Sequence, residues 1–130
     1  MKERLIEIVN ELYAALPRMD WDSYRAHLHA DFRVVETPAL PYPGTFHGMA
    51  GLLELIGKVF ELFEVFEATP GPMCIGEDHV MVWVEMKMTG RKSGKTINTQ
   101  LIEVFKFEGE KLLEIWPFYY DTELIASIVE

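Results

Sequence analysis

The sequence predicts an α+β domain in which helices pack on one face of a curved, mostly antiparallel sheet. In the first half, residues 3–16 and 49–63 carry apolar residues spaced by three and four positions, the pattern of an amphipathic helix. The second half alternates apolar and polar residues in long runs separated by short turns, as hairpins do. Helices followed by hairpins bury their apolar faces against each other, which gives this architecture.

The composition fits one soluble domain. With 130 residues, we expect residues 1–130 to form a single domain. The chain is 49% hydrophobic and 25% charged, and no stretch approaches the about 20 apolar residues that a membrane helix needs. The N-terminal residues lack the apolar core of a signal peptide, and Cys74 is the only cysteine. We therefore expect a cytoplasmic protein that does not contact membranes.

Charge and motifs exclude several classes of function. The net charge of −9 argues against nucleic acid as a partner, because affinity for phosphates comes largely from Lys and Arg. The locally basic residues 91–95 have the Gly and Ser of a hairpin tip. The sequence has no phosphate-binding glycine loop, and no His lies at metal-ligand spacing from a Cys or an acidic pair. We therefore expect neither a cofactor nor a metal.

Three helices are predicted in the first half of the chain. Pro17 ends the first, residues 3–16. Asp20 is placed to cap a second, shorter helix that carries Trp21 and Tyr24 on one face and stops near residue 30. The third, residues 49–63, is strongly apolar and should pack on the sheet.

The strands follow from alternation and from turn residues. Residues 32–36 form a short strand, and residues 37–44 form a loop because three prolines remove the donors that a sheet needs. Further strands cover residues 63–69, 79–89 and 95–107, with Pro70-Gly71-Pro72 breaking or bending the chain after the first of them. The last strand ends near Tyr120, and Asp121 caps a short C-terminal helix over residues 122–129.

Glu103 is the first candidate for a functional residue. It shares the apolar face of its strand with Leu101 and Phe105. A carboxylate there is costly to bury unless it is paired, hydrogen-bonded, protonated or open to a wet cavity. If Glu103 acts in catalysis, we expect it to satisfy two conditions: a hydrogen bond to a polar side chain, and an enclosed, ligand-sized cavity around the pair. If it does not, we expect an Arg partner or exposure.

Pro117 leaves the facing of the last strand open. Because proline cannot donate to the ladder, Trp116-Pro117 should lie at a bulge or on the unpaired side of an edge strand. A bulge moves the following side chains to the other face. Either Tyr119 and Asp121, or Trp116 with Phe118 and Tyr120, then point to the interior.

The chain resembles the nuclear-transport-factor-2-like superfamily, the cone-shaped fold of ketosteroid isomerases, scytalone dehydratase, limonene epoxide hydrolase and SnoaL-like polyketide cyclases. The resemblance rests on element order and on these motifs: Asp20-Trp21-Asp22, Asp31-Phe32 leading into Glu36-Thr37-Pro38, Gly44 and Gly48, and Glu108-Gly109-Glu110-Lys111 followed by Tyr119-Tyr120-Asp121. It implies a cone-shaped, curved, mixed but mostly antiparallel sheet, three helices from the N-terminal half on its concave side, and a short C-terminal helix.

Ketosteroid isomerase chemistry needs a carboxylate base on the first strand, an oxyanion-stabilising tyrosine on the first helix and a protonated acid on a central strand. Matched to that family, Glu103 takes the position of the acid. Thr37 takes that of the base, and Glu36, one residue earlier, is expected to face the other way. Leu12 takes that of the tyrosine, with Tyr13 rotated by about 100° on the helix. The resemblance therefore predicts a protein that does not use this mechanism.

SnoaL-like enzymes suggest another assignment. Glu103 and Asp121 serve as acid and base, and His47 joins them as a proton donor or substrate anchor. The expected pocket is lined by residues from several elements: Leu12, Glu36, Tyr42, Phe60, Leu101, Trp116 and Tyr119. Other roles remain open: Asp121 as a helix cap, His47 as a loop or surface residue, and Glu36 as a brace of the proline-rich loop.

The resemblance implies a protein that binds a small hydrophobic molecule in the cone pocket, as a cofactor-independent isomerase, lyase or polyketide-cyclase-type enzyme. The alternative is a non-catalytic ligand-binding or dimerisation domain of the same fold. The apolar outer face of the sheet, together with the habit of the family, predicts a homodimer through the sheet.

Overall fold

One six-stranded sheet frames the molecule in the computed structural model, which describes residues 2–130. The elements, in chain order, are α1 (Lys2–Ala15), α2 (Trp21–Ala26), β1 (Leu28–Glu36), β2 (Gly44–His47), α3 (Gly48–Leu62), β3 (Phe63–Gly76), β4 (His79–Gly90), β5 (Thr96–Glu108), β6 (Lys111–Tyr119) and α4 (Thr122–Ser127). The strand order is β2-β1-β6-β5-β4-β3.

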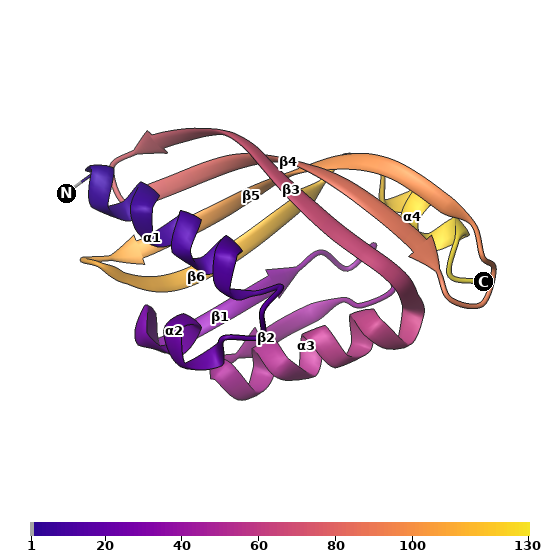
Figure 1. Cartoon of the computed structure of the whole chain (residues 1–130), viewed down its shortest axis with the longest axis horizontal. Helices are drawn as coiled ribbons and strands as arrows, with labels where there is room; N and C mark the ends of the chain where they lie inside the picture. The colour runs from indigo at the N-terminus through magenta and orange to yellow at the C-terminus, as the bar shows by residue number, and fades with distance from the viewer. Residues whose placement is uncertain (1) are drawn as a thin grey trace.

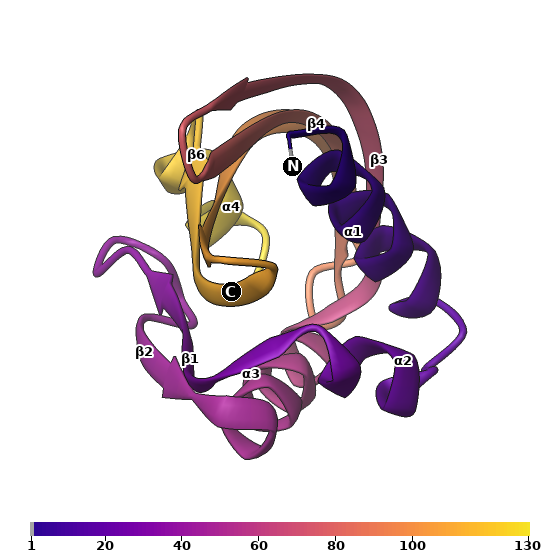
Figure 2. The same cartoon turned by 90° about the vertical axis from the view of Figure 1, so that its left-hand side faces the viewer.

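The sheet is mixed and curved. Strands β3 to β6 form an antiparallel meander, β1 runs parallel to β6, and β2 pairs antiparallel with β1. Figures 1 and 2 show the long strands bending around α1, while α3 lies against the β1–β2 end. This confirms the cone-shaped α+β fold with helices on the concave side and a short C-terminal helix.

The helices follow the predicted patterns. In α1 the residues spaced by three and four positions are buried: Leu5, Ile8, Val9, Leu12 and Ala15. Asp20 caps α2 by accepting a hydrogen bond from the Ser23 N–H at 3.2 Å. This helix ends at Ala26 rather than near residue 30, because Leu28 already pairs with Leu112 at the start of β1. Among residues 2–130, no helix is both long and apolar enough to cross a bilayer.

The prediction treated residues 37–44 as a loop and missed β2. This strand has four residues, too few for an alternation to be read, and it pairs with β1 across the proline-rich loop. At Pro70-Gly71-Pro72, strand β3 continues to Gly76, and its register with β4 shifts between Pro70 and Met73. The segment is therefore an irregularity within one long strand.

Strand β6 settles which aromatic residues face inward. Ile115 and Pro117 are buried and Tyr119 is half-buried, whereas Trp116, Phe118 and Tyr120 are 39%, 56% and 82% exposed. Of the two alternatives expected for Trp116-Pro117, the bulge does not occur there: Pro117 pairs in register with Glu103, and the shift lies at Leu113. The pairing of β1 with β6 ends at Ile115, so Pro117 has a strand partner on one side only.

Candidate active site

Glu103 points into the interior of the cone, as its position in the strand predicts. Its neighbours on the same face of β5, Leu101 and Phe105, are each 3% exposed, whereas Glu103 between them is half-buried. The hydroxyl of Tyr13, on α1, donates a hydrogen bond to Glu103 Oε1 at 2.5 Å. Tyr13 also packs edge-on against Phe105, with the ring centroids 5.6 Å apart. Glu103 therefore has a polar partner that is not an Arg, which is the first of the two conditions expected of a catalytic residue.

The surroundings of this pair raise the pKa of both groups. Burial raises the pKa of Glu103, and the hydrogen bond from Tyr13 opposes that shift only in part. Burial, followed by the negative charge of Glu103, raises the pKa of Tyr13 far above its ordinary value. A neutral carboxyl beside a neutral phenol can donate hydrogen bonds to an oxygen in the interior.

Glu36 is a second carboxyl in the same interior. It ends β1, in which Phe32, Val34 and Glu36 form the buried face, and it is 6% exposed. Its Oε1 has no hydrogen-bond partner. Burial and, second, the charge of Glu103 raise the pKa of Glu36 from 4.5 to about 8. The expectation that Glu36 faces away was wrong, because β1 ends at Glu36 and the alternation cannot be counted from Thr37.

Two further tyrosines complete the interior. Tyr42, from the proline-rich loop, is 1% exposed, and its ring lies edge-to-face with Phe63, Phe66 and Tyr119 at centroid distances of 6.0, 6.2 and 6.3 Å. Its hydroxyl has no hydrogen bond of ordinary geometry. Burial and the neighbouring Tyr42, Glu36 and Glu103 raise the pKa of Tyr119. We call Tyr13, Glu36, Tyr42, Glu103 and Tyr119 the interior cluster.

Sequence reasoning chose Leu12 where the structure has Tyr13. Leu12 is 2% exposed and belongs to the helix stripe that packs in the core. Tyr13 lies one position along, at the edge of that stripe, and its longer side chain reaches Glu103. A hydroxyl-bearing aromatic residue bordering an apolar stripe was the signal that could have identified it.

Four other predicted residues lie elsewhere. Asp121 caps α4, where its Oδ1 accepts a hydrogen bond from the Leu124 N–H at 2.9 Å. His47 is exposed at the end of β2. Phe60 is 53% exposed on α3, and Trp116 is 39% exposed on the outer face of the sheet. Phe60 and Trp116 therefore do not line the interior, in contrast to the prediction, whereas Leu101 and Tyr119 point to it.

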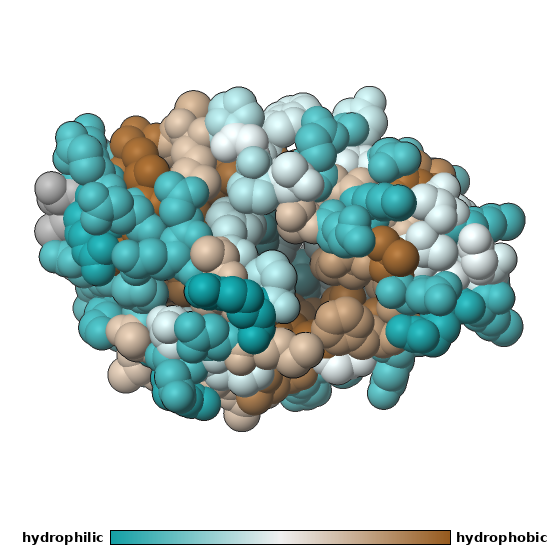
Figure 3. Space-filling model, in the orientation of Figure 1, coloured by the Kyte–Doolittle hydropathy of each residue, from teal (hydrophilic) through white to brown (hydrophobic). Residues whose placement is uncertain are grey.

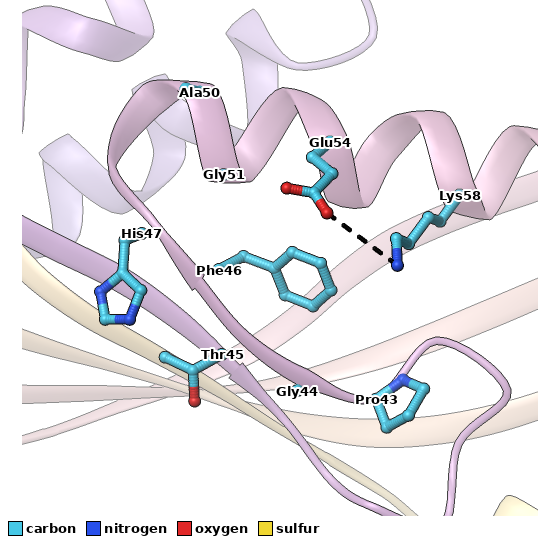
Figure 4. A pocket seen from close by; sticks show the side chains of 9 residues that line it. All are labelled: Pro43, Gly44, Thr45, Phe46, His47, Ala50, Gly51, Glu54 and Lys58. Carbon is cyan, nitrogen blue, oxygen red and sulfur yellow. Dashed lines mark ion pairs between the residues drawn. The ribbon is translucent and has the colours of Figure 1, made fainter.

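A separate hollow lies between β2 and α3 (Figure 4). Phe46 points from β2 toward the helix, and His47 and Thr45 project from the other side of the strand. Lys58 lies 5.8 Å from the centre of the Phe46 ring and 3.9 Å from Glu54. This open hollow holds no residue of the interior cluster.

The space-filling view shows another hollow, near the middle of the face seen in Figure 1, with hydrophobic side chains along part of its rim (Figure 3). Within residues 2–130, no three His, Cys, Asp or Glu side chains come together as metal ligands would. The chemistry that the interior offers is that of carboxyl and phenol groups.

This architecture is that of the nuclear-transport-factor-2-like superfamily. A family model of the SnoaL-like domain matches residues 9–115, and the chain belongs to that family. No curated protein matches the chain.

Solved structures share the fold over nearly the whole length. An NTF2-like protein of unknown function from Burkholderia pseudomallei is 21% identical, with a TM-score of 0.88 and 97% of each chain covered. TerC co-crystallised with polyporic acid is 19% identical, with a TM-score of 0.87 and coverage of 97% and 98%. A putative SnoaL-like polyketide cyclase from Jannaschia sp. is 15% identical, with a TM-score of 0.81 and coverage of 99% and 93%.

Proposed function

We propose that this SnoaL-like domain binds a small hydrophobic molecule inside the cone and moves a proton on it, as a cofactor-independent isomerase, lyase or polyketide-cyclase-type enzyme. One observation carries the proposal: Glu36, whose pKa is raised to about 8, lies in the same interior as the Glu103–Tyr13 pair. Acid–base catalysis needs a base with a pKa near the working pH and donors that stay neutral.

The residues divide into a base and a pair of donors. Oε1 of Glu36 has no partner in the protein and is free to accept a proton from a carbon next to a carbonyl. The electron pair of that C–H bond then moves onto the carbonyl oxygen. Because Glu103 accepts from Tyr13 through Oε1, a protonated Glu103 keeps its own O–H for the developing oxyanion. Glu36 returns the proton to the substrate, so that atoms and charge balance.

This assignment reverses the expectation drawn from the ketosteroid isomerase comparison. A base at the end of the first strand, a tyrosine on the first helix and an acid on a central strand are the three parts of that chemistry. Glu36, Tyr13 and Glu103 occupy β1, α1 and β5 respectively. The kind and location of these groups support proton transfer beside a carbonyl.

The aromatic side chains of the interior favour a hydrophobic ligand. Tyr42, Phe63, Phe66 and Phe105 present aromatic surface around the polar groups. Among proteins of the same fold, one was co-crystallised with polyporic acid and one is named a putative polyketide cyclase, which supports small cyclic compounds as ligands.

The test is a thermal-shift screen of steroid, polyketide and terpenoid carbonyl compounds, polyporic acid included, because a ligand of the native state stabilises it. Compounds that stabilise the protein are incubated in D₂O, and deuterium uptake beside the carbonyl is followed by NMR. Glu36→Gln should lower the exchange rate by about 10²–10⁴-fold while the thermal shift persists. The control is Glu85→Gln, an exposed carboxylate on the outer face.

Two outcomes contradict the proposal. No stabilising compound would argue against a small-molecule site. Stabilisation without exchange in the wild-type protein would favour the non-catalytic ligand-binding domain.

A further inference from the structure

The interior cluster contains two carboxyl groups and no cationic side chain. Glu103 of β5 raises the pKa of Glu36. Glu36 in turn raises the pKa of Tyr42, in the proline-rich loop, and of Tyr119, on β6. All of them are acids, so none can serve as a counter-ion to an ionised Glu36. A carboxylate buried without a cation is costly, and the protein meets that cost by keeping the group protonated.

The basic residues on neighbouring segments have partners outside the interior. Arg33 of β1 pairs with Glu114 of β6, and Glu114 also accepts from the exposed Trp116. His27 lies 2.6 Å from Glu11. Arg91 donates to the backbone carbonyls of Phe60 and Phe63. These three residues therefore supply no positive charge to Glu36, and an ionised Glu36 would take its counter-ion from a ligand.

The aromatic rings beside these carboxyl groups suit such a ligand. The Tyr42 ring stands at 83° to Phe63 and at 80° to both Phe66 and Tyr119. These rings pack edge to face, and the face of a Tyr or Phe ring attracts an ammonium group through cation–π interaction. Glu36, with its free Oε1, lies close enough to Tyr42 and Tyr119 to shift their titration.

We infer that the molecule taken by the interior cluster is a hydrophobic organic cation, an amine or a quaternary ammonium compound, with Glu36 as its counter-ion. The inference deepens the proposed function, on which it rests for the location of the site, and adds the charge of the ligand. Once Glu36 is ionised, carboxylates and phosphates are disfavoured as ligands, because they would face its negative charge without a compensating cation.

The binding of a permanent cation should depend on pH. With the pKa of Glu36 at about 8, its ionised fraction rises from about one tenth at pH 7 to about nine tenths at pH 9. Affinity for the cation should therefore rise about tenfold over this range. A neutral molecule of the same shape has no such dependence, because it gains nothing from the ionised form.

The test uses phenyltrimethylammonium and its neutral isostere tert-butylbenzene, titrated into the full chain at pH 7 and pH 9 and followed by NMR chemical shifts. The cation should bind more tightly than the isostere, and about tenfold more tightly at pH 9 than at pH 7. Glu36→Gln should remove both the preference and the pH dependence, whereas Glu85→Gln should keep both. Equal or tighter binding of the isostere, no binding of the cation, or a cation affinity unchanged in Glu36→Gln would overturn the inference.

A second variant keeps the test decisive if Glu36→Gln fails to fold. Glu103→Gln keeps Glu36 as the counter-ion, so the cation should still bind more tightly than its isostere, and more tightly at pH 9 than at pH 7. Equal binding of the cation and the isostere in Glu103→Gln would overturn the inference. The deuterium-exchange assay reports separately on the proposed function: exchange on neutral carbonyl compounds together with no cation preference would reject only the charge of the ligand.

Discussion

The hydroxyl of Tyr13 donates a 2.5 Å hydrogen bond to Oε1 of Glu103, joining residues 90 positions apart in the sequence. The contact fixes the distance between α1 and the centre of β5 and leaves the other Glu103 oxygen without a partner in α1. It is the polar contact on which the proposed donor pair depends.

Tyr13→Phe should weaken both the fold and the chemistry. The variant loses a hydrogen bond to a buried group, which costs about 1 kcal/mol of unfolding free energy in urea denaturation. The pKa of Glu103 should rise further, because the hydrogen bond from Tyr13 lowers it. Deuterium exchange on a stabilising carbonyl compound should slow by at least about tenfold. Unchanged exchange would show that the pair is structural only.

Glu36 should make the stability of the protein depend on pH. Its pKa is about 8 in the native state and about 4.5 in the unfolded chain. The stability it contributes is complete below the unfolded pKa and is lost as the pH rises through about 8. The total loss approaches about 5 kcal/mol at most. Urea denaturation between pH 4.5 and 9 measures it.

Glu36→Gln should flatten that profile and be more stable than the wild type at pH 9. The matched control is Glu85→Gln, whose profile should follow that of the wild type. A wild-type stability that stays level from pH 5 to pH 9 would contradict the burial of Glu36 as an unpaired acid.

Tyr42→Phe should behave differently from Tyr13→Phe. The Tyr42 hydroxyl is buried without a hydrogen bond of ordinary geometry, so its removal relieves an unsatisfied group. The unfolding free energy should stay the same or rise, as measured by urea denaturation. A loss as large as that of Tyr13→Phe would reveal a partner for Tyr42 in solution.

We propose that the outer face of the sheet pairs with a second copy of the chain. Met81, Trp83, Trp116 and Phe118 are exposed side chains on β4 and β6, the two neighbours of β5, and Trp116 stacks on Phe118 at an angle of 11°. Light scattering should give a dimer for the wild type and a monomer for Phe118→Lys. Phe60→Lys, exposed on α3, is the control and should remain a dimer. A monomeric wild type would end the proposal.

Much of the fold could be predicted because periodicity reports directly on burial. The sequence alone predicted the apolar stripe of α1 and the alternation of β4. In β4 the buried hydrophobic residues are Val80, Val82, Val84, Met86 and Met88. Short or irregular segments were not: β2 is four residues long, and the end of α2 depends on the pairing of Leu28 with Leu112.

The site was predicted only in part. Glu103 was found because one strand pattern contains it, whereas Glu36 and Tyr13 were judged by matching single positions to another family. A shift of one residue in such a match reverses the inferred face. In this way Leu12 was chosen in place of Tyr13, and Glu36, although expected to line the pocket, was not matched to the base position. The convergence of three elements on one interior depends on the curvature of the sheet, which periodicity does not encode.

The extra residue in β6, Leu113, sets which side chains of this strand face the interior and which face outward. Strand β6 pairs Leu112 with Phe107 and Glu114 with Lys106, so Leu113 has no counterpart on β5. Without it, the alternation would turn Tyr119 toward solvent and Trp116 with Phe118 toward the carboxyl groups. One residue thus decides which aromatic side chains of β6 point into the cone and which lie on the outer face of the sheet.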